Sequence, residues 1–251
     1  MTRLSPPATG RWRNFYHLTV TDSTNEEAAR FIAKGISSGI VAADRQTAGR
    51  GRGDKAWHSP AGKNLYVSFF ERTNPDRALD AAKAAGLAAY DTVAFFLPAA
   101  PVFLKWPNDI LVGRRKLCGI LIQHLTRGRD LFTVTGIGLN IETPPKDAFP
   151  WQWEPTSLEE ASGKSLSPDA VFRRLVSDLA RWSGAAAELD GAFADRVGWM
   201  LGAAIEWRDG AGGHRGTVAR FADRGRRIVV VTTAGEEEEL AAGDIVSILV
   251  S

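Results

Sequence analysis

The amino-acid sequence predicts an α+β fold followed by a small all-β region. Strand-like and helix-like patterns alternate between residues 15 and 188, which favours a β-sheet packed against helices. From about Gly202 the helical periodicity stops, and short apolar segments alternate with turns that contain Gly and Asp. We therefore expect one domain over residues 1–200 and a second, smaller domain over residues 201–251.

The first predicted helix begins at a polar segment. Ser23 precedes Glu26 by three residues, and Thr24 precedes Glu27 by the same number, which is the spacing of a capping box. Gly35 is suited to end this helix. Alternating or continuous apolar runs predict three strands around the helix, over residues 15–21, 39–44 and 64–70.

The middle of the chain predicts a long helix and a series of strands. The Ala-rich segment 76–97 has helical spacing, and Pro98 stops it. Strands are expected over residues 101–106, 109–112, 116–125 and 130–136, with turns at residues 113–115 and 136–140. The segment from Ser167 to Glu188 reads as one amphipathic helix.

Short strands are typical of the last fifty residues. Their spacing favours a small barrel or sandwich, and the acidic run 236–239 reads as a solvated strand edge. The candidates are residues 205–208, 216–221, 227–232, 236–240 and 245–250.

Composition narrows the class of protein. The chain has 251 residues, 44% hydrophobic and 24% charged, with a formal net charge of +2, which is ordinary for a globular protein and gives no sign of nucleic-acid binding. A single cysteine, Cys118, excludes an internal disulfide and fits a reducing compartment. No apolar run is long enough to span a bilayer, and the N-terminus has no secretory signal. We expect a cytoplasmic enzyme or binding protein that involves neither membrane nor DNA.

A loop rich in glycine and cations, residues 49–60, is the most informative segment. Glycines let a backbone approach a ligand closely, and Arg50, Arg52 and Lys55 indicate an anion such as a phosphate or a carboxylate. Trp57 adds a flat apolar wall. A solvated basic loop would explain the same residues, so the rest of the chain decides between the two readings.

Three other segments carry unusual polar residues. Residues 22–25 combine hydroxyls with the amides of a helix start, which can bind a polar ligand. A hairpin at Gly113 would bring Lys105 and Lys116 together as a site for a polyanion. In residues 136–140 the glycines admit a flat group, and the Asn140 amide both donates and accepts hydrogen bonds.

Together these segments resemble the biotin protein ligase family. The resemblance covers about residues 18–145, and the motifs occur in the family's order. They are DSTN at 22–25, QTAGRGR at 46–52, W-S-P-x-G-x-N-L within 57–65, KWPND at 105–109, KLCGIL at 116–121 and GIGLN at 136–140.

The resemblance implies both a fold and a reaction. The fold is a mixed β-sheet flanked by helices, class II synthetase-like and shared with lipoate ligases, followed by an SH3-like β-barrel. The family uses ATP and Mg²⁺ to convert biotin into biotinyl-5'-AMP, then transfers biotin to one lysine of the biotin carboxyl carrier domain of a carboxylase. Members often form dimers, and the sequence leaves a homodimer open.

The family's catalytic and nucleotide-binding residues map onto the motifs. The lysine that matches Lys116 bridges the biotin carboxylate and the α-phosphate. Arg50 and Arg52 belong to a loop that closes over the adenylate, and Arg50 joins Lys116 as a catalytic candidate. Asn108 and Asp109 lie near the phosphates and the magnesium, and Asp109 is expected to help the incoming lysine lose its proton.

The remaining site residues contact the two substrates. Trp57 is expected to form a wall for the adenine or for the closed loop, and Asn140 matches the asparagine that recognises the adenine. The residues expected to bind biotin, besides Arg50 and Lys116, are Ser23, Thr24, Asn25, Gln46, Gly49 and Gly119. The metal ligands are not identified by the sequence.

Three features depart from the family pattern. Gly53-Asp54-Lys55 replaces a more basic Arg-Gly-Arg, which weakens the predicted hold on the adenylate. Gln123 stands where glutamate is common. The segment before residue 15 has no room for a helix-turn-helix domain, so we expect a monofunctional ligase that does not bind DNA.

Four alternatives remain open at the sequence level. A lipoate–protein ligase or octanoyltransferase shares the fold but lacks the basic-loop motif. Cys118 would suit an acyl-thioester mechanism, but it lies in an apolar segment with no nearby histidine and is expected in the core. A non-catalytic biotin- or nucleotide-binding module would not need Lys116. Nucleic-acid binding is disfavoured by the near-neutral charge.

Overall fold

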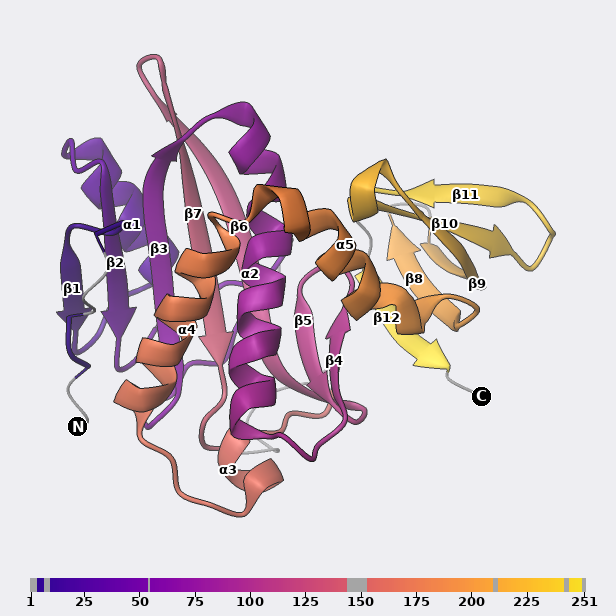
Figure 1. Ribbon diagram of the computed structural model, residues 1–251, viewed down its shortest axis with the longest axis horizontal. Coiled ribbons are helices and arrows are strands. Elements are labelled where there is room, and N and C mark those ends of the chain that lie inside the picture. The colour runs from indigo at the N-terminus through magenta and orange to yellow at the C-terminus, as the bar shows by residue number, and fades with distance from the viewer. Residues whose placement is uncertain are drawn as a thin grey trace.

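Two β-sheets and five α-helices make up the computed structural model within the residues that it describes, namely 4–6, 10–53, 55–143, 153–209, 212–241 and 244–249. A seven-stranded sheet carries helices on both faces, and a five-stranded sheet follows at one end (Figure 1). Within the described residues, no helix is long and apolar enough to cross a membrane.

The larger sheet has the order β1-β2-β3-β7-β6-β5-β4, in which only the β1–β2 pair is parallel. The predicted strands are confirmed with shifted ends. They are β1 (Phe15–Leu18), β2 (Ser38–Ala43), β3 (Leu65–Thr73), β4 (Val102–Lys105), β5 (Asp109–Val112), β6 (Arg115–Arg127) and β7 (Asp130–Leu139).

The turn predicted at residues 136–140 is wrong. Strand β7 continues through Gly136 and Gly138 to Leu139, and both glycines pair with β6 on one side and β3 on the other. Glycine is common in turns, but here it leaves space above the sheet for side chains from other segments. The consequence is an uninterrupted sheet under the candidate site.

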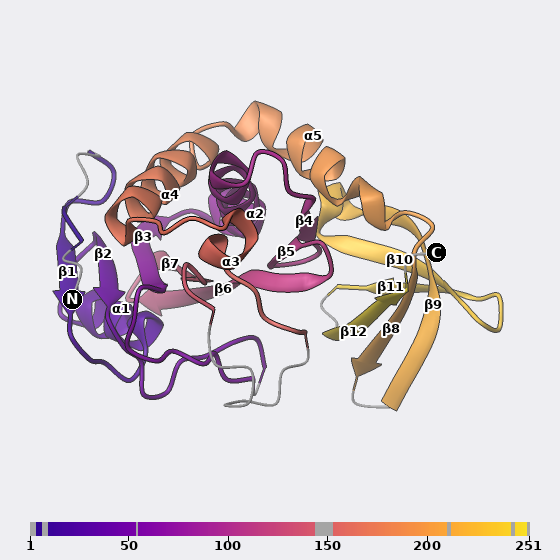
Figure 2. The ribbon, with the colours of Figure 1, turned by 90° about the horizontal axis from the view of Figure 1, so that it is seen from below.

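The helices cover the two faces of this sheet unequally. The long helix α2 (Pro75–Phe96), together with α4 (Pro168–Trp182) and α5 (Ala186–Val197), lies over one face (Figure 2). Helix α1 (Thr24–Ala33) packs on the opposite face, and the short helix α3 (Leu158–Ser162) lies near the end of α2. Alternation along β3 sends Val67 and Phe69 towards α2, whereas Phe70 packs against α1.

Two details of the predicted helices need correction. Ser23 is the N-cap of α1, but its side chain makes no capping hydrogen bond, and Glu26 pairs with Arg50 instead of closing a capping box. The predicted helix 167–188 is broken at residues 183–185, where the Gly184 amide donates to the Arg181 carbonyl and the chain leaves helical register. Gly35 ends α1 with φ 94°, as predicted.

The smaller sheet is antiparallel, with the order β11-β10-β9-β8-β12. Its acidic strand lies at the edge and is largely exposed, as predicted. The sheet starts after the 3₁₀ turn η2 (Gly198–Met200), and the division of the chain at residue 200 stays a prediction. The strands are β8 (Ala204–Asp209), β9 (Gly212–Ala222), β10 (Arg227–Thr232), β11 (Glu237–Leu240) and β12 (Asp244–Leu249).

Indole hydrogen bonds hold the smaller sheet against the end of β4. Trp106, buried directly after β4, donates from Nε1 to the carbonyl of Gly225, which belongs to the turn before β10, at 3.0 Å. Trp199 donates back from Nε1 to the carbonyl of Leu104 at 2.9 Å. Because Trp106 follows Lys105 in the chain, these bonds fix the segment that carries the predicted catalytic residues.

Candidate active site

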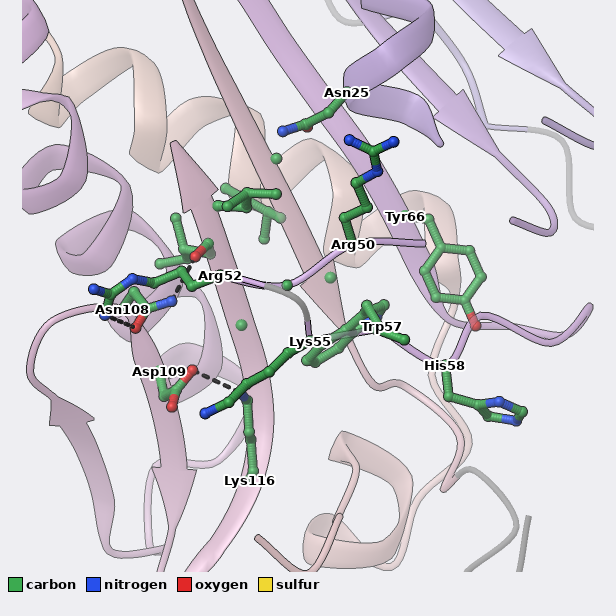
Figure 3. Close-up of a pocket in the computed structure, with 18 of the residues that line it drawn as sticks. Asn25, Arg50, Arg52, Lys55, Trp57, His58, Tyr66, Asn108, Asp109 and Lys116 are labelled. Atoms are coloured by element: carbon green, nitrogen blue, oxygen red, sulfur yellow. Dashed lines mark hydrogen bonds and ion pairs between the residues drawn. The ribbon is translucent and has the colours of Figure 1, made fainter. Parts of the chain in front are cut away.

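A cavity of about 480 Å³ opens on the α1 face of the larger sheet, where β6 and β7 run side by side. It collects residues from all six sequence motifs, and Figure 3 shows Arg52, Lys55 and Lys116 gathered around Asn108 and Asp109. The predicted site residues that line it are Ser23, Thr24, Asn25, Gln46, Arg50, Arg52, Trp57, Asn108, Asp109, Lys116, Gly119 and Asn140.

The floor of the cavity is bare backbone. Gly119 of β6 pairs in register with Gly138 of β7, and the Trp57 indole lies over both. A Cβ atom added to Gly119 would meet Trp57 Cζ3 at 2.7 Å, and one added to Gly138 would meet the same indole under 3.0 Å. Only glycine allows a flat ring to lie this close to the sheet.

Two lysines share one buried carboxylate at the edge of this floor. Lys105 Nζ lies 2.8 Å from Asp109 Oδ2, and Lys116 Nζ lies 2.7 Å from Asp109 Oδ1. The hairpin between β5 and β6 brings Lys116 back towards Asp109, as the sequence predicted for the two lysines. Lys105 is almost fully buried, whereas the Lys116 side chain keeps 25% of its surface exposed to the cavity.

Burial and charge act on these three groups in opposite directions. Burial lowers the pKa of Lys105, although the neighbouring Asp109 carboxylate partly offsets it. Burial also favours the neutral form of Asp109, but the two ammonium groups outweigh that effect and hold the pKa of its carboxyl well below the usual range. The cluster is therefore a fixed carboxylate that holds two cations, with Lys116 the one that a ligand can reach.

Main-chain bonds fix the position of Lys116. Its amide donates to the Glu154 carbonyl at 2.8 Å, and its carbonyl accepts from the Thr156 amide at 2.9 Å. Trp153, from the same segment, places its ring 5.4 Å from Lys105 Nζ. Trp57 similarly faces Lys116 Nζ at 5.3 Å. Two aromatic rings thus flank the two lysines.

Hydroxyl and amide groups form the other end of the cavity. Gln46 Oε1 accepts from the Thr24 amide at 2.8 Å, and Gln46 Nε2 donates to Ser59 Oγ at 2.8 Å. The Ser68 hydroxyl lies 2.7 Å from Thr24 Oγ1 and 2.6 Å from Asn25 Oδ1. All of these groups except Gln46 are buried, so this end is a preorganised set of donors and acceptors without net charge.

The basic loop between β2 and β3 folds over the cavity. Arg50 pairs with Glu26 of α1 at 2.9 Å and points away from Asp109, whereas Arg52 reaches Asn108 Oδ1 at 3.5 Å (Figure 3). Gly49 cannot be replaced here, because a Cβ would meet the Trp57 carbonyl at 2.5 Å. Asp54, part of the predicted departure from the family, lies outside the described residues.

Asn140 anchors a neighbouring turn. Its Nδ2 donates to the Thr156 carbonyl at 3.0 Å, and it is 4% exposed at the cavity wall. Its predicted contact with adenine stays a prediction. Cys118 is completely buried, and burial raises the pKa of its thiol, so the expectation of a core cysteine is confirmed.

Three residues of the site were not predicted from the sequence: Ser68, which bonds the lining residues Thr24 and Asn25, and the lining residues Trp153 and Ile245. Ser68 interrupts an otherwise apolar strand, which is the one local signal that marks it. Trp153 and Ile245 lie far along the chain, and only the fold brings them to the cavity. Ile245 belongs to β12, so the smaller sheet contributes to the wall.

Carboxylates are scarce in the cavity. Asp109 is the only acidic residue among the described residues that line it, and both of its oxygens face lysines. No group of three or more His, Cys, Asp or Glu side chains within the described part of the chain is arranged to hold a metal ion. A magnesium ion here would depend mainly on oxygens from a bound phosphate.

Comparisons with known proteins agree with this geometry. Residues 17–140 match the biotin/lipoate A/B protein ligase family. The chain is 36% identical to a biotin–[acetyl-CoA-carboxylase] ligase of Paracoccus denitrificans over 197 residues, which cover 74% of this chain and 80% of that protein. The chain belongs to the biotin protein ligase family.

Solved structures of biotin protein ligases share the whole fold. The enzyme from Aquifex aeolicus in complex with biotin and ATP is 26% identical, with a TM-score of 0.71, and the match covers 96% of this chain and 100% of that one. The enzyme from Leishmania major in complex with biotinyl-5-AMP is 25% identical, with a TM-score of 0.63 and coverage of 92% and 99%. The predicted family and fold class are confirmed.

Proposed function

We propose that this protein uses ATP to activate biotin as biotinyl-5'-AMP and transfers the biotin to a lysine of a biotin carboxyl carrier domain. The Lys105–Asp109–Lys116 cluster beside a glycine floor carries the proposal. The cluster provides fixed cations next to a flat surface, and the same cavity of about 480 Å³ has a neutral polar end. The matched structures contain biotin with ATP, or biotinyl-5-AMP.

The two ends of the cavity suit the two ends of biotin. The polar end, formed by Thr24, Asn25 and Gln46 with Ser23, offers hydrogen bonds to the ureido ring. The lysine cluster offers cations to the carboxylate. Between them, Leu121 gives the cavity an apolar wall for the hydrophobic part of the molecule.

Activation joins two anions, so cations must offset their repulsion. The biotin carboxylate oxygen attacks the α-phosphorus. The bond between the α-phosphorus and the oxygen that bridges it to the β-phosphorus then breaks, and pyrophosphate leaves with the electron pair. Lys116 is placed to contact both the carboxylate and the phosphate, and Arg52 and Lys105 add positive charge nearby. Asn108 and Asp109 line the cavity beside the lysines and would be the side-chain oxygen donors for a magnesium ion bound with the ATP phosphates, which would offset part of their charge.

Transfer needs a neutral amine on the carrier. The lysine nitrogen attacks the carbonyl carbon of the mixed anhydride, AMP leaves, and the nitrogen loses a proton. The lowered pKa of Asp109 makes it a weak base, which argues against the proton-accepting role expected from the family. We assign Asp109 the role of holding Lys105 and Lys116 in place.

The loop that carries Arg50 and Arg52 is the proposed lid. Arg50 bonds Glu26 at the cavity rim, and closing the loop over an adenylate would exclude water from the mixed anhydride. Trp57 and Asn140 are proposed to contact the adenine. A cytoplasmic location, a homodimer and the absence of DNA binding stay predictions.

The test is incorporation into a carrier. The purified protein is mixed with ATP, magnesium and an apo biotin carboxyl carrier domain, and with either biotin or lipoate, and the product is identified by intact-mass spectrometry. We expect incorporation of biotin only, at the carrier's single modified lysine. Incorporation of lipoate but not biotin would instead support a lipoate ligase.

A further inference from the structure

Gln123 is outside the cavity but bonded to a residue that lines it. It lies on β6, two positions beyond Leu121 on the same face as Gly119, and its Oε1 accepts from Asn25 Nδ2 at 2.7 Å. Asn25 belongs to the first turn of α1, so this bond is one of those that join the helix to the sheet at the polar end of the site. Gln123 is not among the described residues that line the cavity.

The bond is the first in a continuous chain of polar contacts. Asn25 Oδ1 lies 2.6 Å from Ser68 Oγ, and Ser68 Oγ lies 2.7 Å from Thr24 Oγ1. Thr24 Oγ1 lies 3.1 Å from Gln46 Oε1. The chain then continues to Ser59 and the carbonyl of Trp57. It therefore runs from Gln123 to the segment that holds the Trp57 indole.

Proton counting at Ser68 allows this chain two directions. A hydroxyl has one hydrogen to donate, and Ser68 is fully buried between two partners. When Gln123 accepts from the Asn25 amide nitrogen, Asn25 presents its oxygen, and Ser68 must donate to it. Ser68 then accepts from the Thr24 hydroxyl, whose only hydrogen is used there, so Thr24 Oγ1 and Gln46 Oε1 are two acceptors in contact at 3.1 Å.

The opposite arrangement is also consistent with the heavy atoms. If Asn25 is turned over, its nitrogen donates to Ser68, Ser68 donates to Thr24, and Thr24 donates to Gln46 Oε1. Asn25 Oδ1 then needs a donor, which only the Gln123 amide nitrogen would supply. The two directions differ in what the ligand meets, because the first leaves both lone pairs of Thr24 Oγ1 free to accept, whereas the second uses one of them on Ser68.

We propose that Gln123 is a positioning residue for biotin, which acts as a hydrogen-bond acceptor for Asn25 and so makes Thr24 Oγ1 an acceptor for a ligand N–H. A ureido ring carries N–H groups on both sides of its carbonyl, so a fixed acceptor at Thr24 and a fixed N–H at Asn25 would orient it. This inference rests on the proposed function, since it names how that site recognises biotin.

Two substitutions of similar size separate the proposed role from simple packing. Gln123→Glu keeps an acceptor and removes the donor, whereas Gln123→Met removes both. Gln123 is partly exposed, so both side chains fit. His124→Ala is the control on the same strand, because His124 lies on the opposite face, bonded to Thr133.

The measurements are KM for biotin, KM for ATP, kcat and the biotin dissociation constant by calorimetry. We expect Gln123→Met to raise the KM and the dissociation constant for biotin about tenfold, the net effect of one lost hydrogen bond. In Gln123→Glu, the KM and the dissociation constant for biotin should stay within about twofold of the wild-type values. In every variant, kcat and the KM for ATP should stay within the same range.

Distinct results would overturn the inference. Unchanged biotin affinity in Gln123→Met would show that Gln123 does not act on the site. Equal losses of biotin affinity in Gln123→Glu and Gln123→Met would show that the hydrogen bonds run in the opposite direction. A rise in biotin KM in His124→Ala, or a matching rise in ATP KM, would indicate general distortion of β6. A wild-type protein that binds no biotin would refute the proposed function itself.

Discussion

Replacing Asp109 by asparagine should destabilise the protein strongly. Lys105 Nζ lies 2.8 Å from the Asp109 carboxylate, and its side chain is only 4% exposed, so its charge has little access to water. Asp109→Asn keeps the shape but removes the compensating charge. Breaking a buried ion pair by removing one partner typically costs about 3–5 kcal/mol of unfolding free energy.

This loss is measurable by urea unfolding followed by tryptophan fluorescence. A chain of this length loses about 2–4 °C of Tm per kcal/mol, so the Tm should fall by about 10 °C. The double variant Lys105→Met/Asp109→Asn is the matched control, because it removes the stranded charge together with its partner. We expect it to recover most of the lost stability while remaining poorly active.

The same argument fixes a pH dependence for Asp109→Asn. Burial already lowers the pKa of Lys105 in the folded protein, and loss of the carboxylate removes an opposing influence. The unfolded chain therefore binds the proton of the Lys105 ammonium more tightly than the folded protein does. The free energy of unfolding should consequently rise as the pH increases towards about 10. An Asp109→Asn variant within 1 kcal/mol of the wild type, or a double variant less stable than the single one, would refute the reasoning.

Three further experiments test the glycine floor, the acid stability and the docking of the smaller sheet. In Gly138→Ala the new Cβ would collide with the Trp57 indole, so the KM for ATP should rise at least tenfold in steady-state kinetics; an unchanged KM would contradict the glycine floor. Because the pKa of Asp109 lies below its usual value near 4, its contribution to stability is complete above about pH 4 and is lost below it. Acid unfolding followed by circular dichroism should show this loss in the wild type and not in Asp109→Asn. Trp106→Phe removes the hydrogen bond to the Gly225 carbonyl, and it should cost about 1 kcal/mol in urea unfolding; a loss below 0.3 kcal/mol would contradict a role in docking the smaller sheet.

The strands and most of the cavity residues could be predicted from the sequence because their signals are local. Alternating apolar residues define β2 and β3, and the motifs with lysine or arginine are continuous in the chain. The hairpin at Gly113 was enough to predict that Lys105 and Lys116 approach one another. Where a residue and its partner lie within one element or one turn, the pattern predicts the contact.

The errors arose where distant segments decide the local structure. Gly136 and Gly138 read as turn residues, but they are strand residues that leave room for Asn25 and Trp57. Ser68 and Gln123 come from separate strands, so their shared partner Asn25 is visible only in the fold. Long-range packing of this kind has no signature in a single sequence.

The most direct test of the central claim is biotin-dependent exchange of labelled pyrophosphate into ATP, which isolates the activation step from the carrier. The wild type should catalyse exchange with biotin and not with lipoate. Lys116→Ala should reduce it by about 10²–10³-fold, as expected for loss of one preorganised charge contact in the transition state. Its fold should persist, because Asp109 still has Lys105 as partner. Exchange in Lys116→Ala at the wild-type rate, or none in the wild type, would contradict the account.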